Sequence, residues 1–248
     1  MEVAKKSLAI IRVAFLYLLF GFICLLGDFI FIFIVVFCFN KFKIVRNFCR
    51  DLVRVSWAFF IKICQISGYL SFKFDDFNLG KKGELIIANH PSLLDVVFFL
   101  SKIRHLNCVV KGELGKNIFL TFAIKACGYI SNKDDKELLQ NCLNALQSGE
   151  SLLIFPEGTR TKDTITLHKA SFYIAIKQAI TLRVMHIIMK PQCLKGWQKW
   201  YDVPTKTINY EFKNIKNYDI KQYNLDRADP IRVRLLFNEV SEIYKELK

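Results

Sequence analysis

Residues 84–100 read ELIIANHPSLLDVVFFL. The first five residues have the length and composition of a buried strand, and the apolar run stops just before His90. Pro91 and Ser92 are typical of a turn that leads into a helix. Asp95 follows His90 by five residues and is therefore expected in the first turn of that helix. The stretch predicts a strand, a polar turn and a helix in close succession.

The same alternation continues along the chain from about residue 76. Short apolar runs at 84–88, 107–110, 128–131 and 151–155 are expected to be strands, with helices between them at 92–102, 115–126 and 134–149. A helix at 170–180, strands at 184–189 and 207–212, and a closing helix at 228–247 are expected to follow. Strands that alternate with helices favour an α/β fold, with a mostly parallel sheet flanked by helices. We assign residues 76–248 to this domain.

His90 and Asp95 are the first candidates for chemistry. In sheets of this kind, ligands bind in the crevice outside the carboxyl ends of the strands, where His90 is expected. A carboxylate one turn away can accept a hydrogen bond from one imidazole nitrogen. The other nitrogen is then available to take a proton from a hydroxyl. The spacing alone fits a core histidine capped by a helix acid equally well.

A second polar cluster lies in SLLIFPEGTR, residues 151–160. A buried strand is followed by Pro156, which stops it, and by Gly158, which permits a positive φ or close approach of a ligand to the backbone. Arg160 offers a planar fork suited to a phosphate. Glu157 could position a hydroxyl or hold that guanidinium. The alternative is a tight turn with a surface ion pair.

NHPSLLD and FPEGTR together resemble the glycerolipid acyltransferases, the family of lysophosphatidic acid and glycerol-phosphate acyltransferases. The two hallmark motifs of that family, N-H-x4-D and F-P-E-G-T-R, stand here intact and in the expected order. The resemblance covers roughly residues 80–200, in the bacterial branch of the family. It implies that residues 76–248 form an acyltransferase catalytic domain.

The resemblance also implies the chemistry. His90 would be the general base that deprotonates the acceptor hydroxyl, and Asp95 would orient it. A fatty acyl thioester of coenzyme A or acyl carrier protein would be the donor substrate, without an acyl-enzyme, a metal or a cofactor. The residues that match the acceptor-binding motif are Glu157, Gly158, Thr159 and Arg160.

Two lysines are further candidates for binding the acceptor phosphate. Lys111, in VVKGELG, matches a lysine that follows the next strand in many members. Lys133 lies in GYISNK, where members usually carry an arginine, and it cannot supply the bidentate fork. The acceptor therefore stays open between 1-acyl-glycerol-3-phosphate, another lysophospholipid and a specialised lipid.

The N-terminal region predicts a membrane anchor. Residues 8–39 contain only two charged residues, Arg12 and Asp28. We assign residues 1–40 to the anchor, as one span or as two short helices that break near Gly27 and Asp28. Because positive charge flanks both ends of the run, we prefer a re-entrant pair that dips into one leaflet and returns.

Residues 41–75 predict a basic amphipathic helix at the membrane interface. Arg46, Arg50 and Arg54 recur every four residues and would form one helical stripe. Such a stripe beside an anchor suggests contact with anionic headgroups. The alternative is the charged face of an ordinary surface helix.

Composition limits the class of partner. The 248-residue chain has 52% hydrophobic residues and a formal net charge of +14, which favours an anionic surface. Many basic residues flank the apolar run instead of following one groove with stacking aromatics, so we expect a membrane and no nucleic acid. The eight cysteines and four histidines show no metal-ligand spacing.

The leading interpretation is a membrane-bound O-acyltransferase of phospholipid biosynthesis on the cytoplasmic face of the inner membrane. The alternative is a non-catalytic protein that binds anionic lipid.

Overall fold

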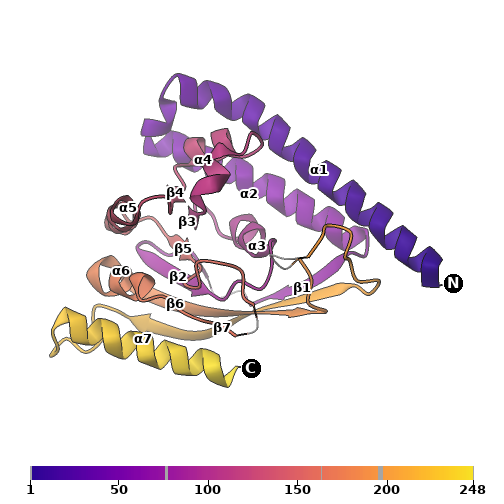
Figure 1. The fold of residues 1–248 in the computed structure, drawn as a ribbon. Coiled ribbons are helices and arrows are strands. Elements are labelled where there is room, and N and C mark those ends of the chain that lie inside the picture. Colours follow the sequence, from indigo (N-terminus) through magenta and orange to yellow (C-terminus); the bar gives the residue numbers. More distant parts are fainter. Residues whose placement is uncertain (1, 76–77, 163, 195–197, 248) are drawn as a thin grey trace.

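The computed structural model describes residues 2–75, 78–162, 164–194 and 198–247. In this part of the chain, seven strands form one mixed sheet in the order β1-β7-β6-β2-β5-β3-β4 (Figure 1). The strands are β1 Leu70–Phe74, β2 Glu84–Ala88, β3 Asn107–Val110, β4 Ile130–Ser131, β5 Leu152–Ile154, β6 Thr181–Lys190 and β7 Ile208–Asp219. The expected α/β fold is confirmed.

The direction of the strands places the polar turns together. The neighbours β6, β2, β5, β3 and β4 run parallel, whereas β7 is antiparallel to β6 and parallel to β1. Leu85 pairs with Leu152 and Ile87 with Ile154, so β2 and β5 end level with each other. The turn that holds His90 and the turn that holds Glu157 therefore leave the same edge of the sheet.

Helices cover both faces of this sheet (Figure 1). One face carries α1 Glu2–Val36, α2 Lys43–Ile66, α3 Asp95–Lys102 and α4 Thr121–Cys127, and the other carries α5 Asp135–Gln147, α6 Ala170–Gln178 and α7 Asp229–Glu246. Short 3-10 turns lie at Phe39–Lys41 (η1) and Gly112–Lys116 (η2). In β2, Ile86 belongs to the core on the α1 side and Leu85 to the core on the α7 side. Burial on both faces explains why β2 is apolar throughout.

The N-terminal region is one continuous helix, so the break expected near Gly27 and Asp28 is wrong. α1 runs through both residues and is followed by η1 and α2. Its two internal charges contact the rest of the protein. Arg12 donates to the carbonyl of Ser67 (3.2 Å), and Asp28 accepts from the amide of Ala123 (3.2 Å).

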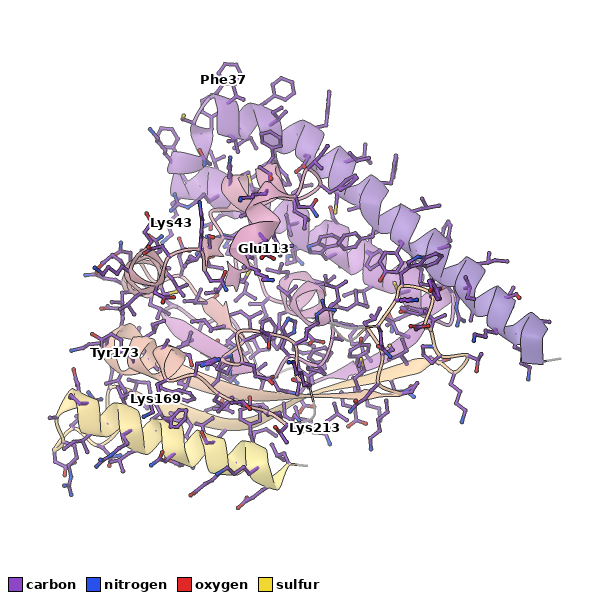
Figure 2. The ribbon with its side chains drawn as sticks, viewed as in Figure 1. Phe37, Lys43, Glu113, Lys169, Tyr173 and Lys213 are labelled. Carbon is purple, nitrogen blue, oxygen red and sulfur yellow. The ribbon has the colours of Figure 1, made fainter. Side chains whose placement is uncertain are left out.

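The outer face of α1 is a continuous apolar stripe. Ala4–Val36 is the one helical segment in the described chain that is long and apolar enough to cross a membrane. Figure 2 shows Phe37 pointing away from the molecule at the turn after α1. The exposed side chains of the stripe recur every three or four residues and are Leu8, Ile11, Phe15, Leu18, Phe22, Leu25, Phe29, Phe33 and Val36.

The arginine stripe of α2 faces the domain, which corrects the expected contact with headgroups. Arg50 is only 3% exposed; its Nη1 lies 2.9 Å from Glu150 Oε2, and its Nε donates to the carbonyl of Cys127 (2.8 Å). Arg46 lies 3.7 Å from Glu150 and donates to two carbonyls of the η1 turn, while Arg54 pairs with Asp51 at 3.5 Å. Arg46 and Arg50 thus attach α2 to Glu150, which lies just before β5, whereas the Arg54 pair lies within α2.

The expected boundary at residue 75 is also displaced. Residues 70–74 form β1, which pairs with β7 and belongs to the sheet. The sequence SFKF alternates apolar and polar side chains, as expected of a strand at the edge of a sheet. The region assigned to an interfacial helix, 41–75, therefore ends in a strand of the main domain.

Candidate active site

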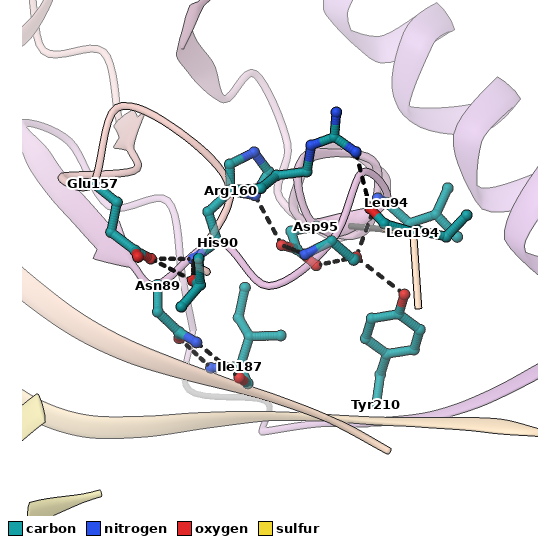
Figure 3. A network of polar contacts seen from close by, with 11 residues as sticks. Asn89, His90, Leu94, Asp95, Glu157, Arg160, Ile187, Leu194 and Tyr210 are labelled. Atoms are coloured by element: carbon teal, nitrogen blue, oxygen red, sulfur yellow. Dashed lines mark hydrogen bonds and ion pairs between the residues drawn. The ribbon is translucent and has the colours of Figure 1, made fainter. Parts of the chain in front are cut away.

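His90 and Asp95 meet at the edge of the sheet, as their spacing predicts. His90 lies in the turn after β2, and Asp95 is the first residue of α3 (Figure 3). Nδ1 of His90 is 2.8 Å from Oδ2 of Asp95. The carboxylate is completely buried, whereas the imidazole is 20% exposed. The ring of His90 stacks on Phe155, with centroids 4.2 Å apart and an interplanar angle of 16°.

Ser92 and Tyr210 hold the carboxylate in place. Asp95 accepts a second bond from the Ser92 amide (2.8 Å) and a third from the Ser92 hydroxyl (2.6 Å). The Ser92 oxygen itself accepts from the Tyr210 hydroxyl (3.0 Å) and the Leu94 amide (3.2 Å). Because those two donors occupy the lone pairs of the oxygen, the Ser92 proton must point to Asp95.

These bonds determine the tautomer of His90. Asp95 accepts from every partner described above, so Nδ1 of His90 carries the proton and Nε2 presents a lone pair. Burial, followed by the nearby charge of Asp95, raises the pKa of the Tyr210 hydroxyl well above its usual range. Tyr210 therefore stays protonated and remains a donor. The arrangement is suited to a base that accepts a proton at Nε2.

The backbone around His90 is fixed by three further side chains. Asn89 bonds in both directions to the backbone of Ile187 on β6, at 2.9 and 2.7 Å. The His90 amide donates to Glu157 (2.8 Å) and to the Thr161 hydroxyl (3.2 Å). The His90 carbonyl accepts from the Thr161 amide at 2.7 Å. Glu157 of FPEGTR and the following Thr161 thus hold the turn that carries His90.

Glu157 has a different role from the expected one. Its carboxylate is buried and accepts from the Thr161 hydroxyl (2.6 Å) as well as from the His90 amide. Burial raises the pKa of Glu157, and these two hydrogen bonds oppose the rise. The expectation that Glu157 holds the guanidinium of Arg160 is wrong, because its oxygens face the His90 turn. Glu157 fixes the backbone of His90.

The other FPEGTR residues shape a turn toward α1. Gly158 has φ +66°, a left-handed conformation that favours glycine. Thr159 is exposed at the turn. Arg160 donates through Nη1 to the carbonyl of Leu194 (2.9 Å), and Leu194 is itself left-handed, at φ +55°. A strained non-glycine residue beside a polar site is typical of a ligand-binding position.

Lys111 and Lys133 lie farther along the same edge. Lys111 follows β3, and Lys133 follows β4, which are two and three strands away from β2. Lys111 pairs with Glu113 at 2.7 Å, and its side chain is 63% exposed. Lys133 is also exposed. Within the described contacts, neither lysine joins the network around His90.

A small apolar pocket of about 60 Å³ adjoins the site. It lies between α1, α2 and the first residues after the catalytic turn. Leu194, whose carbonyl binds Arg160, is part of its lining. The other lining residues are Val13, Leu16, Tyr17, Phe20, Phe60, Tyr69, Leu93 and Leu94. The pocket brings hydrocarbon surface next to a guanidinium and a histidine.

Among the described residues, no cluster of three or more His, Cys, Asp or Glu side chains could hold a metal.

Sequence reasoning missed Ser92, Tyr210, Phe155, Thr161 and Asn89. The hydroxyl of Ser92, three residues before Asp95, could have suggested a bond within the helix start. No local signal identifies Tyr210, which lies 118 residues from Ser92 and reaches it only through the sheet.

The chain resembles several known proteins. The family model described as Acyltransferase matches residues 72–194. A 1-acyl-sn-glycerol-3-phosphate acyltransferase of Helicobacter pylori is 34% identical over 134 residues, which are 52% of this chain and 54% of that protein. A chloroplastic 1-acyl-sn-glycerol-3-phosphate acyltransferase of Arabidopsis thaliana is 27% identical over 103 residues, 39% of this chain and 29% of that protein. The matches thus span about half of one curated relative and less than a third of the other.

The fold has a solved counterpart. The crystal structure of the 1-acyl-sn-glycerophosphate (LPA) acyltransferase from Thermotoga maritima has a TM-score of 0.68 with this chain at 20% identity. The superposition covers 100% of this chain and 98% of that one. At this identity the likeness concerns the fold, N-terminal helix included. The family match over residues 72–194, which contains both motifs around His90, shows that the chain belongs to the acyltransferase family.

Proposed function

We propose that this protein transfers a fatty acyl group from a thioester to the hydroxyl of 1-acyl-glycerol-3-phosphate or a related lysolipid. The observation that carries the proposal is the His90 imidazole, with Nδ1 bonded to a buried Asp95 and Nε2 presented as a base. Membership of the acyltransferase family and the names of the matched relatives support it.

The reaction follows from this geometry. Nε2 of His90 takes the proton of the acceptor hydroxyl while the oxygen attacks the thioester carbonyl carbon. Asp95 stabilises the imidazolium that forms and keeps it oriented. The tetrahedral intermediate collapses, the carbon–sulfur bond breaks, and the imidazolium returns its proton to the leaving thiolate. The ester and the thiol are the products, without an acyl-enzyme, a metal or a cofactor.

The surroundings of Arg160 support a phosphate-bearing lipid as acceptor. A guanidinium binds phosphate through its planar fork, and the apolar pocket beside Leu194 suits a hydrocarbon chain. Lys111 and Lys133, on the same edge, add positive charge for the headgroup. Lys133 in place of an arginine leaves a rival with the same chemistry on another lysophospholipid or a specialised lipid.

The outer face of α1 supports attachment to a membrane. The two charges within its apolar run, Arg12 and Asp28, contact the domain, and the apolar stripe faces outward. We place α1 flat in one leaflet, on the cytoplasmic face of the inner membrane, where anionic lipids attract a basic protein. The lysolipid then reaches the site from the leaflet, and the acyl-CoA or acyl carrier protein donor arrives from water.

An acceptor panel tests the proposal. Purified protein would receive acyl-CoA or acyl carrier protein donors with lysophosphatidate, glycerol 3-phosphate, a neutral lysophospholipid or no acceptor. We expect ester formation with lysophosphatidate, and a rise of about tenfold in the KM for that acceptor in Arg160→Ala, because a charge-assisted contact is lost. Arg234→Ala on the exposed surface of α7 is the matched control. Lipid binding without transfer in any combination would instead indicate a non-catalytic protein.

A further inference from the structure

A second, much larger pocket lies on the α7 side of the sheet. Its volume is about 1090 Å³, and it is bounded by β6, the last turns of α7 and the segment after FPEGTR. Unlike the almost wholly apolar pocket beside α1, its lining mixes polar and apolar side chains. No step of the proposed acceptor binding uses it.

The lining combines cationic, neutral polar and apolar groups. Lys190 at the end of β6 and Lys245 near the end of α7 bring positive charge to the pocket. Among the described lining residues, Glu242 is the one carboxylate that opposes this charge. Asn238 and Thr166 add an amide and a hydroxyl, and apolar side chains lie between them. This mixture fits a long ligand with amides, short aliphatic segments and a phosphate.

His186 contributes a buried polar atom to this lining. The side chain, on β6, is 8% exposed, and in the described part of the chain its Nδ1 has no hydrogen-bond partner. The ring lies edge-on to Tyr244 of α7, with centroids 6.2 Å apart. Burial, followed by the charge of Lys213, lowers the pKa of His186 and keeps the ring neutral. An unpaired buried nitrogen is costly unless a ligand satisfies it.

The pocket also reaches the reaction centre. Asn89 and Pro91, the chain neighbours of His90 on either side, are part of its lining. The apolar pocket is lined by Leu94 and Leu194 and adjoins the same turn from the α1 side. The two pockets thus adjoin the turn that carries His90 from opposite sides of the sheet, and a transfer between two substrates needs two routes. The apolar route borders the membrane-facing helix, which leaves the polar route to the donor that arrives from water.

We propose that the pocket between β6, α7 and residues 161–162 and 164–167 binds the phosphopantetheine arm of the acyl donor. The arm carries two amides and a hydroxyl for the polar lining, and a phosphate for Lys190 and Lys245 at the surface. Coenzyme A and acyl carrier protein share this arm, so the site serves either source. The inference rests on the proposed acyl transfer and adds the place where its donor binds.

Blocking the pocket tests this assignment. Asn238→Trp would fill it, and Arg234→Trp, one turn earlier on the exposed face of α7, is the matched control. With acyl-CoA and acyl carrier protein donors, we expect Asn238→Trp to raise the donor KM about tenfold and to leave the acceptor KM within about twofold. With an acyl-N-acetylcysteamine thioester, which lacks most of the arm, native protein and variant should have the same KM.

A charge reversal gives an independent readout. Lys190→Glu with Lys245→Glu should raise the donor KM and weaken binding of free phosphopantetheine, whereas Lys221→Glu, outside the pocket, should change neither. A larger effect with acyl carrier protein than with acyl-CoA would identify the carrier protein as the source of the arm. An unchanged donor KM in the blocking and charge variants, or a rise in acceptor KM alone, would overturn the assignment.

Failure of the proposed function is distinguishable from failure of this site. If native protein transfers no acyl group, direct titration with phosphopantetheine decides the question. Binding that the double lysine variant weakens supports the site, and the absence of binding overturns it.

Discussion

Asp95 is held by three hydrogen bonds, and the origin of each explains what a sequence can reveal. The bond to His90 follows from spacing within one turn and helix start. The bonds from Ser92 lie within the same motif. The Ser92 hydroxyl in turn accepts a hydrogen bond from Tyr210, which is distant in the sequence and lies nearby only because β7 belongs to the same sheet. Local pairs can be predicted from their spacing, whereas partners joined only by the fold cannot.

Glu157 illustrates the same limit. The motif predicts that Glu157 and Arg160 act together, because they are three residues apart. The turn at Gly158 separates them, and Glu157 faces the His90 amide while Arg160 faces Leu194. Which way each side chain points depends on a backbone conformation that residue types alone do not determine.

Substitutions of Ser92 and Tyr210 test whether their hydrogen bonds orient Asp95. Ser92→Ala removes one bond to Asp95 and leaves the buried Tyr210 hydroxyl without its acceptor. We expect the free energy of unfolding to fall by about 1–3 kcal/mol. We also expect kcat to fall about tenfold or more, because the carboxylate is less firmly oriented. Ser92→Ala/Tyr210→Phe should regain stability without regaining kcat. Denaturant unfolding and steady-state kinetics measure both, and a Ser92→Ala protein equal to native in both would contradict this role.

Among the elements, α2 differs most from its expected role. Its arginines recur every four residues, as they would in a stripe on a surface helix. This spacing does not show whether the stripe contacts lipid headgroups or packs against carbonyls and a carboxylate of the protein. Arg50 bonds to Glu150, Cys127 and His105. The expected helix is correct, but its orientation depends on Glu150, which lies 100 residues away in the sequence.

The Arg50–Glu150 pair predicts a large loss of stability. Glu150→Ala leaves the buried guanidinium uncompensated, and we expect the free energy of unfolding to fall by about 3–5 kcal/mol. The double variant Arg50→Met/Glu150→Ala should lose less, because no unpaired charge remains. Urea unfolding in detergent measures these values. A Glu150→Ala protein of native stability would contradict this structural role of the pair.

His186, between β6 and α7, predicts a pH dependence. Because its pKa in the folded protein is below the ordinary value of 6.5, the unfolded chain binds the extra proton first as the pH falls. Stability contributed by the neutral ring is therefore present above pH 6.5 and is lost progressively below it. His186→Asn should flatten the stability profile between about pH 7 and pH 5. Thermal unfolding across that range checks it, and parallel profiles for the two proteins would rule out this linkage.

For the whole molecule, the proposed membrane attachment depends on how α1 lies against the domain. Composition predicts the apolar segment but cannot distinguish a spanning helix from one that lies flat. The decisive contacts, Arg12 with Ser67 and Asp28 with Ala123, attach α1 to the domain at two well-separated points. A helix attached in this way cannot cross the bilayer while the domain stays in water.

Thiol labelling tests this arrangement. In a background with exposed Cys38 replaced by Asn, which tolerates its left-handed backbone, Lys5→Cys reports on the start of α1 and Lys206→Cys on the domain. In sealed vesicles with the domain outward, a membrane-impermeant reagent should label both cysteines at similar rates. Labelling of Lys5→Cys only after permeabilisation would show that α1 spans the membrane.

Thiol release from the acyl donor by native protein and by His90→Ala, in the presence of lysophosphatidate, tests most directly whether His90 is the base. His105→Asn is the matched control, because His105 also pairs with an aspartate, Asp51 (3.0 Å), but lies outside the site. We predict that His90→Ala lowers acceptor-dependent release by about 10²–10⁴-fold, while His105→Asn retains it. Equal release by native protein and His90→Ala would contradict the assignment of His90 as the base.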